Sequence, residues 1–259
     1  MPDLFLELRD DEAAAGITPA PQPLPEADAL ALLQTAEFAA SKLIPWGSNY
    51  SFAVALETAE GREQLAIYKP RGGEAPLYDF PDGSLYRREC AAYVFSRRLG
   101  WDLVPPTVVR DGPHGVGSVQ LYVEPRPDDG EGTRFWGSCR PEIERLVLFD
   151  HLVNNADRKI GHCLRDPAGK VWGIDHGLTF HRHPKLRTVL WQYVGARIAP
   201  DLLADLRRLR RRPEELVREL APYLDRSEID ALLGRVDRFV EAGAYPNLNP
   251  RRNVPYGWW

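Results

Sequence analysis

The segment from Glu144 to Phe180 places the strongest constraint on the fold, because it combines a buried helix, two acidic loops and a short hairpin. Its apolar residues repeat near helical spacing as far as Val153, which predicts a buried helix. The helix should end at Asn154 and Asn155, since asparagine favours helix ends and turns. Asp157 therefore falls in a loop that directly follows a fixed element.

The second acidic loop follows the predicted hairpin. After a turn at Asp166 to Gly169, the apolar strand Val171 to Ile174 leads into the triplet that begins with Asp175, and His162 stands five positions after Asp157. Phosphoryl transfer uses one carboxylate to orient the attacking hydroxyl and further ligands to hold the phosphate-bound metal. In protein kinases the metal-binding Asn follows the catalytic Asp by five residues, and a later Asp-Phe-Gly supplies another ligand. Asp157 is thus a candidate catalytic residue, with His162 and Asp175 as candidate metal ligands; solvated loop acids are the alternative.

Ser48, Asn49 and Tyr50 stand in a turn between a predicted helix, Glu26 to Ile44, and a predicted strand, Phe52 to Leu56. Small residues in this turn would let backbone N–H groups approach a triphosphate, and the Ser48 and Asn49 side chains can donate as well. The turn is a candidate phosphate loop, and a routine hairpin turn is the alternative.

A lysine and a glutamate form the next candidate pair. The strand Gln64 to Tyr68 ends at Lys69, and Glu89 lies in a helical pattern, Leu85 to Phe95, that stops at Gly100. Lys69 would bind nucleotide phosphates if a carboxylate held its ammonium in place, and Glu89 is the candidate partner. An edge lysine and a solvated glutamate are the alternatives.

Two further strands are predicted at Val104 to Val109 and at Gly117 to Glu124, with a turn between them. The second strand runs into a proline-containing connector, where a two-lobed kinase would bind an adenine ring through backbone groups. The candidate hinge consists of Tyr122, Val123 and Glu124.

Toward the C-terminus the sequence predicts helices at 202–209, 213–224 and 227–242, the last opened by a capping box at Ser227 to Asp230. Five arginines between Arg207 and Arg212 could grip a phosphorylated substrate or an acidic membrane patch, or could form a solvated helix end. The histidines of this half lack the fixed spacing of a zinc site.

Composition limits the class of protein. With 259 residues, 44% of them hydrophobic, the chain can bury a substantial core in one two-lobed domain or two small ones. A net charge of -4 argues against a nucleic-acid surface. No apolar run is long enough for a transmembrane helix and no signal-peptide pattern is present, so we expect no transmembrane association and a cytoplasmic location. Three widely spaced cysteines predict free thiols.

Taken in order, seven short motifs show a resemblance to a known family. They are Gly47-Ser48-Asn49-Tyr50, Tyr68-Lys69-Pro70, Arg88-Glu89-Cys90-Ala91-Ala92-Tyr93, Val104-Pro105-Pro106-Thr107, Gly117 to Glu124, Asn155-Ala156-Asp157-Arg158 and Gly173 to Phe180. The chain resembles the phosphatidylinositol 3-/4-kinase superfamily from about Pro45 to Pro200, most closely the catalytic core of type II phosphatidylinositol 4-kinases. It also resembles a bacterial group of proteins related to those kinases.

The resemblance implies an α+β, bilobal protein-kinase-like fold. A flexible lead-in at 1–24 would precede an antiparallel-sheet N-lobe at 25–125 and a mostly helical C-lobe at 126–259. It further implies that Lys69 binds ATP phosphates with Glu89 as its partner, that Asp157 is catalytic and that Asp175 binds Mg²⁺ or Mn²⁺.

Two departures from that family bear on function. His162 replaces the asparagine that serves those kinases as second metal ligand, and an imidazole suits Mn²⁺ better than Mg²⁺. The cysteine-rich stretch that is palmitoylated in type II enzymes is missing, so a protein or small molecule is favoured over a lipid as acceptor. The expected activity is ATP-dependent transfer of a γ-phosphoryl group to a hydroxyl of a protein, a small molecule or an inositol-type acceptor. The alternatives are a nucleotide-binding pseudokinase that regulates a partner and a kinase-fold enzyme that transfers AMP.

Overall fold

The computed structural model describes residues 18–19, 24–57, 61–127 and 132–257. Contacts within the chain define two units. The first comprises Met1–Cys90 and Pro105–Glu124, and the second comprises Ala91–Val104 and Pro125–Trp259. Helix α3 (Leu85–Leu99) begins in the first unit and ends in the second. Apart from Thr18, Pro19 and Leu24, the predicted lead-in lies outside the described residues.

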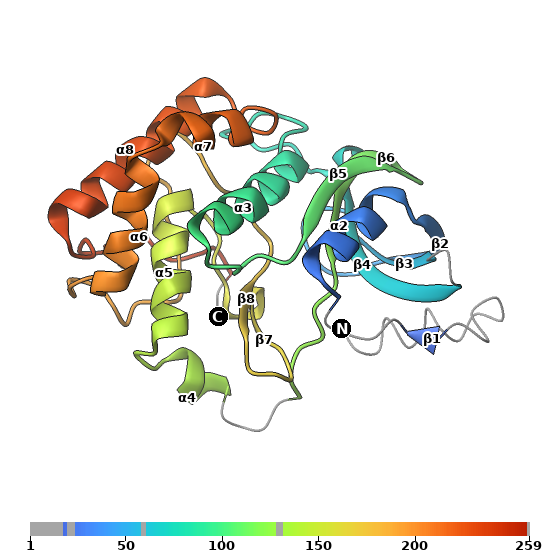
Figure 1. Cartoon of the computed structure of the whole chain (residues 1–259), viewed down its shortest axis with the longest axis horizontal. Helices are drawn as coiled ribbons and strands as arrows, with labels where there is room; N and C mark the ends of the chain where they lie inside the picture. Colours follow the sequence, from blue (N-terminus) through green and yellow to red (C-terminus); the bar gives the residue numbers. More distant parts are fainter. Residues whose placement is uncertain (1–17, 20–23, 58–60, 128–131, 258–259) are drawn as a thin grey trace. The chain divides into compact units, whose positions relative to one another are not determined.

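An antiparallel sheet forms the body of the first unit (Figure 1). Its strands lie in the order β2 (Glu37–Leu43), β3 (Phe52–Glu57), β4 (Arg62–Pro70), β6 (Gly115–Leu121) and β5 (Thr107–Gly112). The two-residue strand β1 (Thr18–Pro19) pairs in parallel with the start of β4. Strand β4 is therefore central, and the candidate Lys69 lies near its end.

The two faces of this sheet differ. Helix α2 (Glu26–Thr35) covers one face, where Leu33 packs against Val54 and Tyr68. Side chains alternate along a strand, so Leu65 and Ile67 of β4 point to the other face. There they pack with the buried residues Ile44, Ala53 and Tyr122. Lys69 continues this second face, because it stands two residues after Ile67.

One prediction for this unit was wrong. The sequence pattern predicted a single helix from Glu26 to Ile44, but the helix ends at Thr35 and Glu37–Leu43 forms β2. Residues 37–43 pair with β3 from Glu37 opposite Glu57 to Leu43 opposite Phe52. Strand formation depends on cross-strand neighbours more than on intrinsic preference, and here those neighbours override an alanine-rich, helix-like composition.

The second unit is mostly helical (Figure 1). Helix α8 packs against α5 and α6, and a small hairpin of β7 and β8 lies beside α5. The elements are α4 (Gly132–Trp136), α5 (Pro141–Val153), β7 (Cys163–Arg165), β8 (Val171–Gly173), α6 (Pro200–Arg210), α7 (Pro213–Leu220) and α8 (Arg226–Ala242). With the antiparallel sheet of the first unit, this confirms the predicted α+β class.

Several predicted boundaries were shifted. Strand β5 begins at Thr107 rather than Val104, and α7 ends at Leu220 rather than Leu224. Asp225 caps helix α8. The Asp225 carboxylate accepts from the Glu228 N–H at 3.0 Å. In return, the Glu228 carboxylate accepts from the Asp225 N–H at 3.2 Å. The capping box therefore lies two residues before the one predicted.

Ion pairs surround the arginine cluster at the end of α6. Arg208 pairs with Asp205, Arg210 with Asp237 and Arg212 with Glu215, which favours a charged helix surface for the arginine cluster. In the described part of the chain, no helix has the length and apolarity needed to cross a bilayer. Cys90, Cys139 and Cys163 are free thiols.

Candidate active site

The end of α5 fixes the start of the acidic loop. Asn154 terminates the helix in a left-handed conformation with φ of 55°, and its side chain donates to the backbone oxygens of His181 and His183. The Asn155 side chain accepts from the Asp157 N–H at 3.0 Å and donates to Asp150 at 2.9 Å. The loop that carries Asp157 is therefore tied to the last turns of α5.

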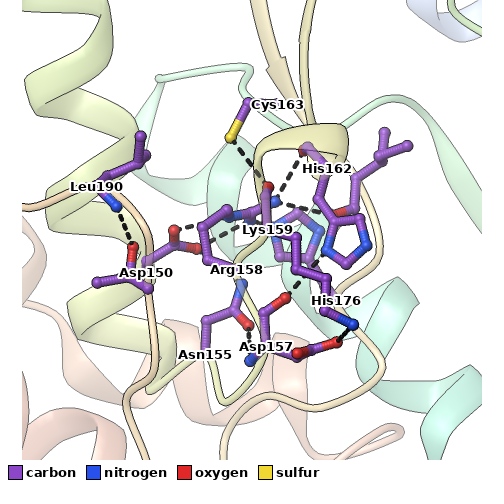
Figure 2. Close-up of polar contacts among 11 residues, drawn as sticks. Asp150, Asn155, Asp157, Arg158, Lys159, His162, Cys163, His176 and Leu190 are labelled. Carbon is purple, nitrogen blue, oxygen red and sulfur yellow. Dashed lines mark hydrogen bonds and ion pairs between the residues drawn. The ribbon is translucent and has the colours of Figure 1, made fainter. Parts of the chain in front are cut away.

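Arg158 lies at the centre of the polar contacts in Figure 2, and it is buried. Its side chain is 0% exposed, and it binds both carboxylate oxygens of Asp150 at 2.7 and 2.9 Å. The guanidinium also donates to the backbone oxygens of His162, at 2.8 Å, and Ile174, at 3.0 Å. It lies 2.8 Å from His176 Nε2 as well. One side chain thus joins α5 to the backbone of His162 and to that of Ile174, the residue before Asp175.

The charge of this centre follows from its partner. Burial by itself lowers the pKa of Arg158, but the charge and hydrogen bonds of Asp150 outweigh burial and leave that pKa raised. The guanidinium therefore stays protonated although it is shielded from water. Such a buried pair is costly to break from one side, because the remaining charge has no partner.

His162 and Asp175 lie side by side. His162 Nδ1 is 3.0 Å from the backbone oxygen of Asp157, and Nε2 is 3.2 Å from Asp175 Oδ2. A carbonyl oxygen only accepts, so Nδ1 carries the hydrogen, and in a neutral ring the Nε2 lone pair faces a carboxylate. Two acceptors this close need a shared hydrogen or a bound cation between them.

The donor set suits a six-coordinate cation. Neighbouring ligands around an octahedral ion with bonds of about 2.0–2.1 Å lie about 3 Å apart, close to the His162–Asp175 separation. Among the described residues, no three His, Cys, Asp or Glu side chains gather into a metal site. These two residues would therefore share an ion with phosphate and water oxygens, as Mg²⁺ and Mn²⁺ commonly do.

Asp157 has an altered proton affinity. Burial raises the pKa of its carboxyl, and Asp175 acts in the same direction, while Lys159 and His162 oppose them. Its Oδ2 lies 3.0 Å from the Lys159 ammonium. A carboxylate with a raised pKa beside a partly exposed lysine can accept a proton and release it again.

The first unit contains the predicted lysine–glutamate pair. Lys69 Nζ lies 2.5 Å from Glu89 Oε1, and the two side chains are 24% and 3% exposed. Lys69 stands at the end of the apolar sheet face formed by Ile44, Ala53 and Tyr122. The ammonium is thus held by a buried carboxylate and remains partly accessible at the edge of an apolar surface.

The candidate phosphate loop is attached to a neighbouring turn. The Tyr50 N–H donates to Gly73 O at 2.8 Å, and the Asn49 side-chain oxygen accepts from the Ala75 N–H at 2.8 Å. Ser48 is exposed. The Asn49 oxygen and the Tyr50 N–H are therefore used within the protein, whereas the Asn49 amide hydrogens and the Ser48 groups are the ones suited to a ligand.

The candidate hinge follows β6. Tyr122 is buried, and burial with the nearby Glu124 raises the pKa of its phenol to about 12. Its backbone N–H donates to Leu65 O at 3.1 Å and so is used by the sheet. An adenine contact would have to use other backbone groups of Val123, which is buried, or Glu124, which is exposed.

Several residues of this site were missed by sequence reasoning. Asp150, Lys159 and His176 received no role, and Arg158 was noted only as part of a motif. The available signals were weak: Lys159 is a cation two residues after an acidic candidate, and Asp150 is a charged residue in an otherwise apolar helical face.

Comparisons with known proteins bear on the fold and on the family of the chain. No family model matches the chain. The crystal structure of the Golgi casein kinase with Mn/ADP bound has a TM-score of 0.53 at 15% identity, and the match covers 87% of this chain and 80% of that one. The structure of hydra Fam20 with sugar has a TM-score of 0.54 at 14% identity, covering 93% and 94%. These likenesses establish a kinase-like fold and confirm the predicted fold class.

A relative in sequence is Protein Rv2133c of Mycobacterium tuberculosis (strain ATCC 25618 / H37Rv). It is 36% identical over an alignment 289 residues long, and the alignment covers 98% of this chain and 97% of that protein. The match therefore extends over both units and includes the candidate site. The chain belongs to the family of Protein Rv2133c.

Proposed function

We propose that the chain is an ATP-dependent phosphotransferase of the phosphatidylinositol 3-/4-kinase-like group, with lobes at 25–125 and 126–259. The observation that carries this proposal is the arrangement of Asp157, His162 and Asp175 around one buried Arg158. A carboxylate suited to accept a proton and a neighbouring pair of candidate metal ligands are what γ-phosphoryl transfer needs. Arg158 holds the backbone at His162 and Ile174, next to that pair.

Nucleotide binding is assigned to the first unit. Lys69, held by Glu89, would bind the phosphates, and the apolar face that ends at Lys69 suits an adenine ring. The Golgi casein kinase structure holds Mn and ADP, which supports ATP with Mn²⁺ or Mg²⁺ as the ligands of this chain. The Ser48 to Tyr50 loop and the Tyr122 to Glu124 segment are proposed to contact the phosphates and the adenine.

Proton transfer is assigned to Asp157. Its carboxylate would accept the proton of the attacking hydroxyl, and the raised pKa makes this acceptance more favourable. Lys159, 3.0 Å away, would then compensate the negative charge of the transferred group. His162 and Asp175 would hold the divalent ion, which when bound neutralises charge on the phosphate oxygens.

The acceptor is proposed to be a hydroxyl of a protein or a small molecule rather than of a membrane lipid. The net charge of -4 does not favour an acidic lipid surface, and a shared fold does not determine the acceptor. The proposed acceptor classes therefore differ from that of the lipid kinases the sequence resembles.

The test follows the label from ATP without assuming an acceptor. Incubation with Mn²⁺ and either γ- or α-labelled ATP should release or transfer the γ label only. Asp157→Asn should lower that rate about 10²- to 10⁴-fold, the usual effect of losing a general base. The exposed Asp201 gives a matched control, because Asp201→Asn removes a carboxylate of the same unit and should leave the rate unchanged.

The other outcomes identify the alternatives. Transfer of the α label to protein would show an AMP-transferring enzyme. Tight ATP binding with no turnover by the wild-type protein would show a pseudokinase.

A further inference from the structure

Three consecutive residues, Gly73, Glu74 and Ala75, hold two other parts of the first unit; we call them the clasp. Gly73 O accepts from the Tyr50 N–H and the Ala75 N–H donates to the Asn49 side chain, each at 2.8 Å. A Cβ at Gly73 would lie 2.6 Å from Tyr50 O, so only glycine permits this approach. The clasp thus fixes the loop that carries the proposed phosphate contacts.

The middle residue of the clasp binds the start of α3. Glu74 Oε2 accepts from the Leu85 N–H at 3.0 Å, and Oε1 accepts from the Tyr86 N–H at 2.8 Å. The first N–H groups of a helix have no partner within the helix, and negative charge is favourable at this end. A side chain eleven residues earlier in the chain therefore caps the helix with both of its oxygens.

The capped turn is directly connected to the candidate phosphate-binding pair. Glu89 lies three and four residues after Tyr86 and Leu85, which is about one helical turn, or roughly 4.5–6 Å along the axis. Its carboxylate holds Lys69, and Lys69 stands five residues before Glu74. The contacts form a closed circuit from Lys69 through Glu74 and the first turn of α3 to Glu89 and back.

We propose that Glu74 is a positioning residue, which sets the Lys69–Glu89 pair by fixing the first turn of α3. Its catalytic meaning rests on the proposed function, in which that pair binds ATP phosphates. Without the Glu74 carboxylate, the first turn loses both acceptors, Glu89 is no longer held against β4, and the Lys69 ammonium is released for part of the time.

A hollow beside Glu74 makes this role accessible to experiment. It has a volume of about 320 Å³, and Arg71, Glu74, Phe80 and Leu85 are among the residues that line it. Its walls include Glu74 and Ala75 of the clasp and the first residue of α3, and the cationic Arg71 also lines it. A small carboxylate such as formate should therefore reach the helix end when the Glu74 side chain has been removed.

The experiment measures how fast an amine-reactive reagent acetylates Lys69 in the intact protein without nucleotide. The modified protein is then digested, and mass spectrometry of the peptide that contains Lys69 gives the rate. A lysine held by a buried carboxylate reacts slowly. In Glu74→Ala the acetylation rate should rise about 2- to 30-fold, the range expected for losing a helix N-cap. Added formate should lower the rate again. Glu89→Gln removes the carboxylate that holds Lys69 and should raise the rate as well.

Two further variants control for the general effect of losing a helix cap and for a failure of Glu74→Ala to fold. Asp225→Ala removes the cap of α8 in the second unit and should leave Lys69 unchanged. Glu74→Gln keeps the length but accepts through one oxygen, so an intermediate rate is expected even if the alanine variant does not fold. Wild-type rates in the Glu74 variants, or an equal rise in Asp225→Ala, would contradict the positioning role.

A second arm separates this role from the proposed function. ATP with Mn²⁺ should protect Lys69 of the wild-type protein from acetylation. If the acetylation rate depends on Glu74 but ATP does not lower it, the positioning role of Glu74 is supported and the proposed nucleotide site is contradicted.

Discussion

At the scale of single residues, Arg158 and Asp150 form the pair on which the second-unit site depends. Arg158→Met leaves the Asp150 carboxylate 1% exposed with its main partner gone. We expect the free energy of unfolding to fall by about 3–5 kcal/mol, the usual cost of breaking a buried pair from one side. Urea unfolding measures this change.

A surface pair provides the control for Arg158. Arg210 and Asp237 are each 47% exposed, and Arg210→Met should cost less than about 1 kcal/mol. An equally small loss in Arg158→Met would mean that Asp150 finds other partners and that Arg158 does not organise the site.

The sequence predicted only in part which residues lie close together in the site. The spacing of Asp157, His162 and Asp175 drew attention to residues that the structure brings together in one unit. Spacing could not identify Arg158, because Asp150 and His176 stand eight and eighteen positions away from it. Glu74 was missed for the same reason, since the N–H groups it binds are eleven and twelve positions away.

At the scale of elements, α5 carries a histidine that makes the protein sensitive to acid. Burial lowers the pKa of His151 from 6.5 to about 4, and its ring packs against Phe239 of α8 and Tyr245. As the pH falls below 6.5, the unfolded chain takes up a proton that the folded protein binds only near pH 4. Stability therefore falls with pH across this window.

His151→Phe keeps a ring in the cluster and removes the titration. The wild-type protein should lose about 2 kcal/mol more than this variant between pH 7 and pH 5, as measured by urea unfolding at both values. Phe239→Leu disturbs the same packing but keeps the histidine, so it should retain the wild-type pH dependence. An unchanged slope in His151→Phe would show that His151 is not the group responsible.

Elements with local signals were predicted well, and those that depend on distant partners were not. The end of α5 at Asn154 and the hairpin around Asp166 to Gly169 follow from turn chemistry within a few residues. Strand β2 has no such signal, because its conformation comes from pairing with β3. The start of α8 was misplaced because both Asp225 and Ser227 are suitable caps, and the structure uses the first.

At the scale of the whole molecule, nucleotide binding should appear as a metal-dependent rise in melting temperature. A ligand at 100 times its dissociation constant stabilises a protein by about 2.7 kcal/mol. For a chain of this size that corresponds to roughly 5–10 °C. The rise with ATP should be at least as large with Mn²⁺ as with Mg²⁺, because the proposed ligand His162 would supply a nitrogen.

Asp175→Ala is the matched variant for this measurement. It should melt near the wild-type temperature without ligand and lose the metal-dependent part of the rise. A rise that persists in Asp175→Ala would place the metal elsewhere. Strict dependence on Mg²⁺, unchanged in His162→Ala, would contradict the role given to the imidazole.

The overall fold was predictable because several short motifs occur in the order that a kinase-like chain requires. Composition alone would have allowed many α+β folds, and no single motif such as Tyr68-Lys69-Pro70 is specific. The acceptor was not predictable, since it depends on surface shape and charge that no short motif encodes.

Asp175 has a φ of 60°, a left-handed conformation that glycine adopts freely and other residues adopt at a cost. Screening of random variants for heat resistance alone would therefore favour glycine at this position. Screening for ATP-dependent activity would retain the aspartate. Directed evolution of the same gene along these two routes should diverge at this codon, so a descendant selected for heat resistance would be the first to lose the proposed metal ligand.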